Sequence, residues 1–227
     1  MIKILSKNIQ APEFVEMLSG EKPSFVEDSR WEKIQLLKQE KDKLRSLVSA
    51  YLLNKMCEEL EIESPRYEYG EKGKPYLAGQ ENVVFNLSHS GEYAVLAYAA
   101  NTNEGNRISQ REEKAITKIG IDIQEIRPMK EGMIHRILHE IEKSSFFLSE
   151  EEPITNVNRV WCIKESYVKM LGVGLSLDFR NIVIDFDKQL VKAEGDEGAF
   201  FAEVDSRQGY VLAVCCNRDF QFEITEC

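Results

Sequence analysis

The chain has 227 residues, of which 43% are hydrophobic and 30% are charged, and its formal net charge is −10. This length allows one large domain or two halves of roughly 100 residues each, and either can bury a core. The negative charge argues against broad nucleic-acid binding, which needs clustered Lys and Arg. No apolar run approaches the ~20 residues of a membrane span, and residues 1–10 lack the apolar core of a signal peptide. We therefore expect a cytoplasmic protein that binds neither nucleic acid nor membrane.

The chain contains five cysteines, an odd number, without C-x-x-C spacing. The five lie mostly in apolar stretches, and they are Cys57, Cys162, Cys215, Cys216 and Cys227. This distribution predicts buried thiols rather than disulfides or a zinc site.

Residues 31–60 carry the first strong helical pattern. Five apolar residues follow the i, i+3, i+4, i+7, i+8 spacing of one buried helix face: Leu44, Leu47, Val48, Tyr51 and Leu52. No Gly or Pro interrupts the segment, so we expect one long helix. Residues 38–45 read KQEKDKLR, and this basic cluster is either a solvated helix face or part of a ligand site.

Two strands are expected at residues 83–87 and 93–98, joined through the sequence SHSG at 88–91. At such a strand end or turn, backbone N–H groups and the Ser88 hydroxyl can face a phosphate oxygen, and His89 can donate to it. A surface or capping histidine is the alternative for His89. Residues 101–118 are polar and lack apolar periodicity, which predicts a long mobile loop.

Residues 119–124, with the sequence IGIDIQ, predict a strand with two different faces. Because side chains alternate along a strand, the three isoleucines share one face, and Gly120, Asp122 and Gln124 share the other. An aspartate in an apolar strand is costly unless it is paired, hydrogen-bonded or bound to a metal. We therefore expect a cation site at Asp122, with a turn cap or a lysine partner as the alternative. Glu125 points to the opposite face unless a bulge shifts the register.

His135 and His139 have the i, i+4 spacing of helix metal ligands, but we interpret them as surface histidines. No third ligand is evident nearby, and the apolar spacing indicates an ordinary amphipathic helix through Ile134, Ile137, Leu138 and Ile141.

The sequence WCIKESYVKMLGVGL at 161–175 predicts an amphipathic helix that ends at paired glycines. Lys164, Glu165 and Lys169 are placed where they could meet a ligand that carries both a metal ion and phosphates. An ordinary surface pair of Glu165 and Lys169 is the alternative. After this helix, strands of a second sheet are expected at 181–186, 199–204, 210–215 and 220–225. The fold class is then α+β, with a helix and a sheet in each half.

Four motifs follow one another along the chain: GKPYL at 73–77, FNLSHSG at 85–91, IGIDIQ at 119–124 and W-x-x-KES-x-x-K at 161–169. Together with the glycines after the last motif, this order resembles the 4′-phosphopantetheinyl transferases. It resembles specifically the Sfp-like kind, which has two similar halves in one chain. The resemblance covers residues from about 38 to 175.

The resemblance implies a pseudo-twofold α+β fold, whose halves at 1–110 and 111–227 each contain a mainly antiparallel sheet with packed helices. The first half would lie on the nucleotide side of coenzyme A, and the second would carry the metal strand and the KES helix. It also implies an enzyme of the holo-[acyl-carrier-protein] synthase type. Such an enzyme transfers the phosphopantetheine arm of coenzyme A to a serine of an apo acyl or peptidyl carrier protein and releases adenosine 3′,5′-bisphosphate. The carrier would serve fatty acid, polyketide or nonribosomal peptide biosynthesis, and the chain would act as a monomer.

The resemblance further implies the site residues. Asp122, Glu165 and Lys169 would be catalytic, and Glu165, or a water that it orients, would take the serine proton. Asp122, Gln124 and Glu165 would hold Mg²⁺ or Mn²⁺, with coenzyme A as the co-substrate. The residues expected to bind coenzyme A are Arg45, Lys74, Pro75, Ser88, His89, Lys164 and Lys169.

Gln124 departs from the common GIDIE sequence of the family, which has a second carboxylate at this position. Its amide oxygen can still face a metal, directly or through water, but it brings no charge, so weaker metal affinity is expected. This departure keeps one alternative open, a catalytically impaired coenzyme A-binding module with a regulatory or scaffold role. An unrelated interaction domain would require four ordered motif matches to be accidental.

Overall fold

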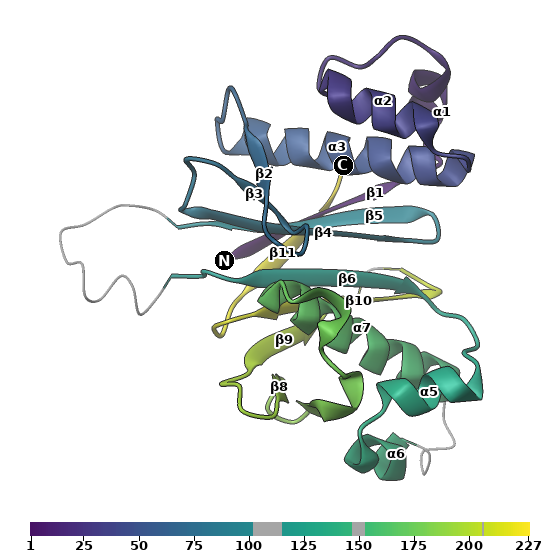
Figure 1. Ribbon diagram of the computed structural model, residues 1–227, viewed down its shortest axis with the longest axis vertical. Coiled ribbons are helices and arrows are strands. Elements are labelled where there is room, and N and C mark those ends of the chain that lie inside the picture. The colour runs from purple at the N-terminus through teal and green to yellow at the C-terminus, as the bar shows by residue number, and fades with distance from the viewer. Residues whose placement is uncertain (102–114, 147–152, 206) are drawn as a thin grey trace, which may run out of the picture.

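The computed structural model describes residues 1–101, 115–146, 153–205 and 207–227. Two β-sheets pack against each other in the middle of the molecule, and helices cover their outer faces (Figure 1). The α+β class is therefore confirmed. Among the described residues, none of the helices has the length and apolar character needed to span a bilayer.

The first sheet has the strand order β11-β1-β5-β4, with β1 antiparallel to β5, β5 antiparallel to β4, and β1 parallel to β11. Its strands are β1 (Ile2–Asn8), β4 (Val83–Ser90), β5 (Tyr93–Ala100) and β11 (Phe222–Glu226). The helix α3 (Glu40–Glu59) packs on its outer face, and α1 (Pro12–Ser19) and α2 (Asp28–Leu36) pack against α3. A small two-stranded sheet of β2 (Tyr67–Tyr69) and β3 (Pro75–Leu77) lies beside β4.

The second sheet is antiparallel and has the order β6-β10-β9-β8-β7. Its strands are β6 (Ile119–Glu125), β7 (Ile182–Asp185), β8 (Leu190–Ala193), β9 (Ala199–Glu203) and β10 (Tyr210–Cys216). The long helix α7 (Pro153–Leu171) packs across β6 and β10, and α5 (Glu131–Ile137) and α6 (Glu140–Phe146) lie beside it. Two short 3₁₀ turns follow α7: η1 (Gly174–Ser176) and η2 (Phe179–Asn181).

The predicted two-faced strand at 119–124 is confirmed. Ile119, Ile121 and Ile123 are buried between the two sheets, together with apolar residues of β1 and β5. The opposite face of β6 lies against α7, where Gly120 has its closest contacts. This alternation places Asp122 on the side of the strand that meets α7.

The prediction of a single helix at 31–60 is wrong, because α2 ends at Leu36 and α3 begins only at Glu40. Leu37 and Gln39 have extended backbone angles, and Leu36 is 82% exposed. The break lets α2 fold back onto α3, so that Ile34 joins the same buried core as Leu47. Burial of α2 against α3 outweighs helix propensity at the break, and no Gly or Pro marks this position in the sequence.

The helix predicted across His135 and His139 is also interrupted. It ends at Ile137, Leu138 is extended, and α6 begins at Glu140. His139 lies just before α6, and its Nδ1 accepts a hydrogen bond from the N–H of Ile141 at 3.2 Å. A side-chain cap therefore starts a new helix where the apolar spacing predicted continuity.

The last predicted strand belongs to the first sheet rather than to the second. β11 pairs in parallel with β1, with Ile224 opposite Ile4. The strand at residues 190–193 was not predicted, because its four residues are too few to show a clear pattern. Position 110, the expected boundary between the halves, and most of the loop expected at 101–118 lie outside the described residues. Buried thiols are confirmed for Cys57, Cys162, Cys215 and Cys216, whereas Cys227 is half-buried.

Candidate functional site

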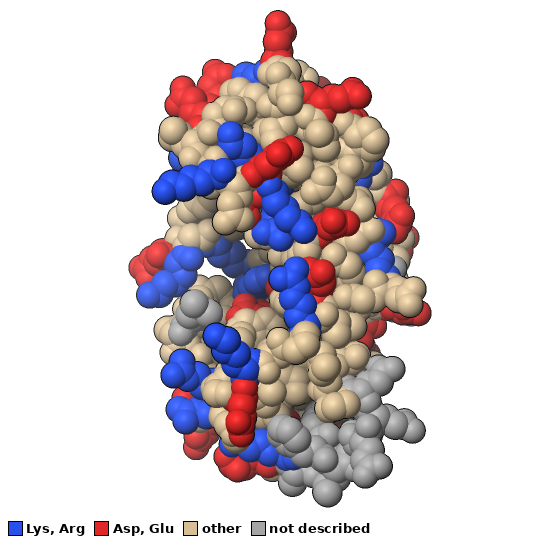
Figure 2. Space-filling model, turned by 90° about the vertical axis from the view of Figure 1, so that its right-hand side faces the viewer, with Lys and Arg blue, Asp and Glu red and all other residues tan. Residues whose placement is uncertain are grey.

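A cavity of about 720 Å³ lies between the first sheet with its helices and the second sheet with its helices, which we call the first half and the second half of the molecule. Figure 2 shows a hollow at mid-height of one face, with Lys and Arg side chains around it. One wall comes from α3 and β4, with Arg45, Ser88 and His89. The other wall comes from β6 and α7, with Asp122, Gln124, Glu165 and Lys169. Most of the predicted site residues therefore converge on one cavity.

Asp122, Lys169 and Ser88 form the tightest polar contact of the cavity. Lys169 Nζ donates to Asp122 Oδ1 at 2.5 Å and to Ser88 Oγ at 2.8 Å. Ser88 Oγ donates to the same Asp122 oxygen at 2.7 Å. Asp122 is buried, and a buried carboxylate needs such partners. The lysine partner that the sequence left as an alternative for Asp122 is thus present, and it occurs inside the candidate site.

Glu165 lies one helical turn before Lys169 on α7 and is partly buried in the cavity wall. Burial raises the pKa of its carboxyl, the negative charge of Asp122 raises it further, and Lys169 opposes both effects. Among the described residues, neither the Glu165 carboxylate nor Asp122 Oδ2 has a hydrogen-bond partner. The cavity therefore holds carboxylate oxygens that are available to a ligand.

Gln124 lines the same cavity, and its Nε2 donates to the Glu125 carbonyl at 3.1 Å. This bond leaves its amide oxygen as the remaining polar atom of the side chain. Glu125 lies on the other side of the strand, where its carboxylate pairs with Arg127 and approaches Gly91. As expected, Glu125 does not replace Gln124 in the cavity.

The residues present fit a divalent cation by the chemistry of their donors. Asp122 and Glu165 supply carboxylate oxygens, and Gln124 supplies a neutral oxygen. Two carboxylates at one partly buried site repel each other and favour a bound cation. No cluster of three or more His, Cys, Asp or Glu side chains with metal-binding geometry occurs in the described parts of the chain, so this two-carboxylate set depends on the amide or on a ligand to add donors.

Arg45 and His89 line the side of the cavity that α3 and β4 form. Arg45 pairs with Asp42 at 2.9 Å, and its Nη2 donates to the Gly91 carbonyl at 3.0 Å. Its Nε is buried without a hydrogen-bond partner in the described structure. Desolvation, and then the charges of Arg45 and Lys169, lower the pKa of His89. His89 is therefore neutral near pH 7 and can donate a hydrogen bond without adding charge.

Strand alternation divides the sequence SHS between two sides of β4. Ser88 and Ser90 point toward β6 and accept hydrogen bonds from its backbone, at 3.4 Å from Ile123 N and 3.1 Å from Glu125 N. His89 points the other way, toward Arg45 and the cavity. Ser88 and His89, which were expected to act together on a phosphate, therefore face different partners.

Gly120 allows α7 to approach β6 closely enough to complete the site. A Cβ at this position would lie 2.0 Å from the Ser166 carbonyl oxygen and 2.4 Å from Met170 N. These distances exclude any side chain at the present spacing of helix and strand. The glycine of the sequence IGID is therefore needed for packing, and through packing it sets the distance between Asp122 and Lys169.

Lys74 does not face the cavity that contains the carboxylates, although it was expected to bind coenzyme A. Its Nζ donates to the carbonyls of Ile119, Lys169 and Met170 at 2.9, 2.8 and 3.1 Å. These bonds occupy all three N–H groups of the ammonium and satisfy carbonyls at the end of α7. Desolvation, and then the nearby charge of Lys118, lower the pKa of Lys74 to about 8. Its neighbour Pro75 does line the cavity.

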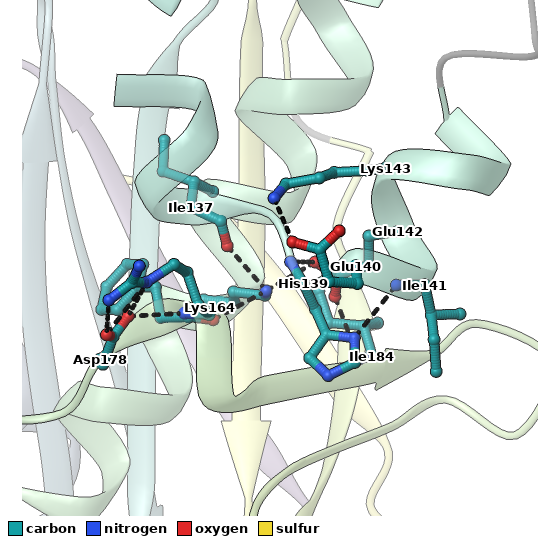
Figure 3. Close-up of polar contacts among 11 residues, drawn as sticks. Ile137, His139, Glu140, Ile141, Glu142, Lys143, Lys164, Asp178 and Ile184 are labelled. Atoms are coloured by element: carbon teal, nitrogen blue, oxygen red, sulfur yellow. Dashed lines mark hydrogen bonds and ion pairs between the residues drawn. The ribbon is translucent and has the colours of Figure 1, made fainter. Parts of the chain in front are cut away.

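Lys164 also lies away from the cavity, contrary to the expectation that it binds coenzyme A. Its Nζ donates to Glu142 Oε2 at 2.6 Å and to the carbonyls of Ile137 and Phe179 at 2.8 and 3.0 Å. Figure 3 shows Lys164 pointing toward Glu142 and Ile137, inside the second half. Both charged side chains are buried, and all three N–H groups of the ammonium are used. Burial lowers the pKa of Lys164, and the Glu142 carboxylate opposes this shift.

Sequence reasoning missed several residues at the site. Arg30 lines the cavity, and its Nη2 donates to the Ser46 carbonyl at 3.2 Å. Asn86 accepts a hydrogen bond from Ile121 N at 2.9 Å, next to the bonds of Ser88 and Ser90. The sequence signal for Asn86 was present, since polar residues recur at every second position, 86, 88 and 90, in a strand that begins with apolar residues. No comparable signal identifies Arg30, because α2 was predicted to continue into α3.

Comparison with known proteins supports the resemblance noted in the sequence. Residues 118–215 match the 4′-phosphopantetheinyl transferase superfamily, and residues 21–101 match the family described as 4′-phosphopantetheinyl transferase, N-terminal. The 4′-phosphopantetheinyl transferase ffp of Bacillus subtilis is 27% identical, over 89% of this chain and 87% of its own. The 4′-phosphopantetheinyl transferase Sfp of Bacillus subtilis strain 168 is 24% identical, over the same shares.

A solved structure, the holo-[acyl-carrier-protein] synthase of Thermotoga maritima, aligns with 26% identity and a TM-score of 0.38. The alignment covers 44% of this chain and 62% of that one, and the assignment of the family does not depend on it. It depends on the two halves, which match 4′-phosphopantetheinyl transferases in chain order, and on relatives that align along most of the length. The chain therefore belongs to the 4′-phosphopantetheinyl transferase superfamily and is of its Sfp-like type.

Proposed function

We propose that this protein transfers the 4′-phosphopantetheine arm of coenzyme A to a serine of an apo acyl or peptidyl carrier protein. The observation that carries this proposal is the convergence of Asp122, Glu165, Lys169, Arg45 and His89 on one cavity between the halves. Carboxylates beside cationic and neutral donors match a substrate that brings a pyrophosphate and a metal ion. Membership of the family supports the same reaction.

The reaction exchanges one P–O bond for another. The serine Oγ forms a bond to the β-phosphorus of coenzyme A, and the bond from this phosphorus to the bridging oxygen breaks. The products are the holo carrier and adenosine 3′,5′-bisphosphate. This chemistry needs alignment, charge neutralisation and removal of the serine proton.

Lys169 and Arg45 would bind phosphate oxygens. Among the described residues, Lys169 Nζ uses two of its three N–H groups on Ser88 and Asp122, which leaves one for a ligand. His89, in its neutral form, would donate a further hydrogen bond to a phosphate oxygen. Glu165 would accept the serine proton, directly or through a water that it orients.

Asp122, Glu165 and Gln124 would hold a divalent cation, Mg²⁺ or Mn²⁺. When bound, such an ion neutralises the negative charge that develops on the leaving phosphate. Both walls of the cavity come from one chain, and we propose that a monomer forms a complete site.

The test is intact mass spectrometry of an apo carrier protein incubated with this protein, coenzyme A and Mg²⁺, with a matched reaction that lacks the metal. We expect a mass gain of one phosphopantetheine arm that requires the metal and is lost in Asp122→Ala and Glu165→Ala, both folded by circular dichroism. Apo carriers from fatty acid, polyketide and nonribosomal peptide synthesis should all be tried. A complete lack of mass gain with all three would contradict the proposed transfer.

A further inference from the structure

The edge strands β4 and β6 of the two sheets lie side by side, and side chains of β4, rather than its backbone, accept hydrogen bonds from the backbone of β6. We call this line of contacts the seam. Asn86, Ser88 and Ser90 alternate along β4 and point toward the free edge of β6. They accept hydrogen bonds from the alternating N–H groups of Ile121, Ile123 and Glu125 at 2.9, 3.4 and 3.1 Å. An exposed edge strand would leave these N–H groups unpaired. The seam therefore fixes the register of β6, the strand that carries Asp122, against the first half.

The middle side chain of the seam differs from the outer two. Asn86 and Ser90 accept from β6 without contacting the carboxylate, whereas Ser88 Oγ also donates to Asp122 Oδ1 at 2.7 Å and accepts from Lys169 Nζ at 2.8 Å. A hydroxyl has one donor and two acceptor positions. In Ser88 all three are occupied by protein atoms, and the side chain is buried. No hydrogen-bonding capacity remains on this hydroxyl for a phosphate oxygen.

The contact is directed at one oxygen of the carboxylate. Both Ser88 and Lys169 bond to Asp122 Oδ1. In the described structure, Oδ2 is the oxygen of Asp122 that has no hydrogen bond. The hydroxyl thus restrains rotation of the carboxylate from the side of the first half, while Lys169 restrains it from α7.

We propose that Ser88 is a positioning residue that orients the Asp122 carboxylate toward a bound divalent cation, and that it is not itself a phosphate ligand. This inference rests on the proposed function, because it takes Asp122 as a metal ligand. Side chains that hydrogen-bond to metal ligands typically change metal affinity or activity about 10–100-fold when they are removed. An effect of that size through Ser88 would link the seam between the halves to the chemistry of the cavity.

Ser90 supplies a matched control for Ser88. Ser88→Ala and Ser90→Ala each remove one hydroxyl acceptor from the same strand and leave one N–H of β6 without its partner. Only Ser88→Ala also removes a hydrogen bond to Asp122 and an acceptor of Lys169 Nζ, which itself holds the same carboxylate oxygen. Loss of seam stability is therefore common to both variants, and loss of carboxylate orientation is specific to one.

The experiment measures binding without any carrier protein. The Mn²⁺ affinity of each variant is determined from the electron paramagnetic resonance of free Mn²⁺ at saturating coenzyme A, and the coenzyme A affinity is determined by calorimetry without metal. We expect Ser88→Ala to weaken Mn²⁺ binding about 10–100-fold and to leave metal-free coenzyme A binding unchanged. Ser90→Ala should bind Mn²⁺ like the wild type, and Ser88→Thr, which keeps the hydroxyl, should recover most of the affinity.

Three results would overturn the inference. One is equal Mn²⁺ affinity in Ser88→Ala and Ser90→Ala, another is a tenfold loss of metal-free coenzyme A affinity in Ser88→Ala, and the third is absence of Mn²⁺ binding by the wild type. If Ser88→Ala does not fold, Ser88→Cys keeps the volume, weakens the donor and is judged by the same criteria. Since no carrier is present, failure of the transfer reaction in the mass assay would be recognised separately.

Discussion

Helix α7 carries two lysines that form ion pairs of similar length, one fully buried and one beside the cavity. Lys164 and Glu142 are 2.6 Å apart and 0% and 3% exposed, with every N–H of the ammonium used. Lys169 and Asp122 are 2.5 Å apart and 28% and 8% exposed, beside a cavity. The first pair ties α7 to α5, α6 and η2, and the second faces the space between the halves. Distance alone therefore does not reveal function, whereas access and remaining donors do.

The helix itself explains why the two lysines differ. Residues five positions apart on an α-helix point about 140° away from each other. One direction leads into the second half, where Glu142 also accepts hydrogen bonds from the N–H groups of His139 and Ile184 at 2.8 and 3.3 Å. The other leads toward β6 and the first half. The same motif thus supplies an internal clamp and a candidate ligand contact.

The largest effect is expected from breaking the buried pair. Lys164→Met leaves the Glu142 carboxylate buried without its cation, which should cost about 3–5 kcal/mol of unfolding free energy. The double variant with Glu142→Gln removes the charge and keeps an acceptor for one of the two backbone N–H groups, which bond to different oxygens of the carboxylate. It should therefore recover part of this loss. Urea unfolding of the two single variants and the double variant measures the coupling. A coupling energy near zero would show that the pair does not act as a clamp.

The next largest loss of stability is expected when α7, which carries both lysines, is pushed away from β6. Gly120→Ala places a Cβ against backbone atoms of α7, and the helix must shift away from β6. We expect a stability loss of about 3 kcal/mol, at the upper end for overpacking. Gly132→Ala is the matched control, because a Cβ there meets no atom of the described residues within 4 Å. If thermal unfolding shifts equally in the two variants, close packing at Gly120 is not what holds α7 in place.

How much of this contrast the sequence could predict depends on the range of the contacts. Alternation within one strand was enough to place Asp122 opposite the isoleucines, and helical spacing was enough to put Glu165 and Lys169 on one side of α7. The direction of Lys164 was not predictable, because its partner Glu142 lies on another element, 22 positions away. Lys74 shows the same limit, since its carbonyl partners are 45 to 96 positions away.

The fold shows a corresponding division. The strands near 83–100 and 119–125 could be predicted from local patterns, but the sheet that β11 joins could not. Its pairing with β1 connects the two ends of the chain, and the alternation in β11 is the same whichever sheet it enters. Pairing partners depend on burial between distant segments, which no local period encodes.

For Lys169, the lysine beside the cavity, we expect substitution to weaken coenzyme A binding with little loss of stability. Lys169→Met removes a charged donor from the candidate phosphate site, and a charge-assisted hydrogen bond contributes about 1.5–3 kcal/mol. Coenzyme A affinity by calorimetry should fall at least about tenfold, while the stability loss stays well below that of Lys164→Met. Lys188→Met is the control, since Lys188 is exposed and paired with Asp185 far along the second sheet. Equal coenzyme A affinity in both variants would remove Lys169 from the phosphate site.

The smallest change in stability is expected for a third lysine, Lys74. Its ammonium donates to three carbonyl oxygens, whereas the Lys164 ammonium donates to two carbonyl oxygens and one carboxylate. Lys74 joins the segment before β3 to β6 and to the end of α7 through three carbonyl oxygens. Among the described residues no carboxylate opposes the effect of burial, and with the nearby charge of Lys118 burial lowers the pKa of Lys74 to about 8, from an ordinary value of 10.5. Between these two values the unfolded chain binds more protons at this position than the folded chain does. The contribution of Lys74 to stability should therefore increase as the pH rises from about 8 toward 10.5.

Comparison of the wild type with Lys74→Met isolates this group, because the other titrations are shared. Urea unfolding at about pH 7 and about pH 9.5 should show the wild type gaining stability relative to the variant at the higher pH. For Lys164→Met the expected effect has the same sign but is smaller, since Glu142 opposes the lowering of the Lys164 pKa. A difference between wild type and Lys74→Met that stays flat or shrinks with pH would mean that the buried ammonium is as stable as one in water. Carbonyl dipoles would then compensate burial as well as a full carboxylate charge does, and the distinction between the two buried lysines would rest on geometry alone.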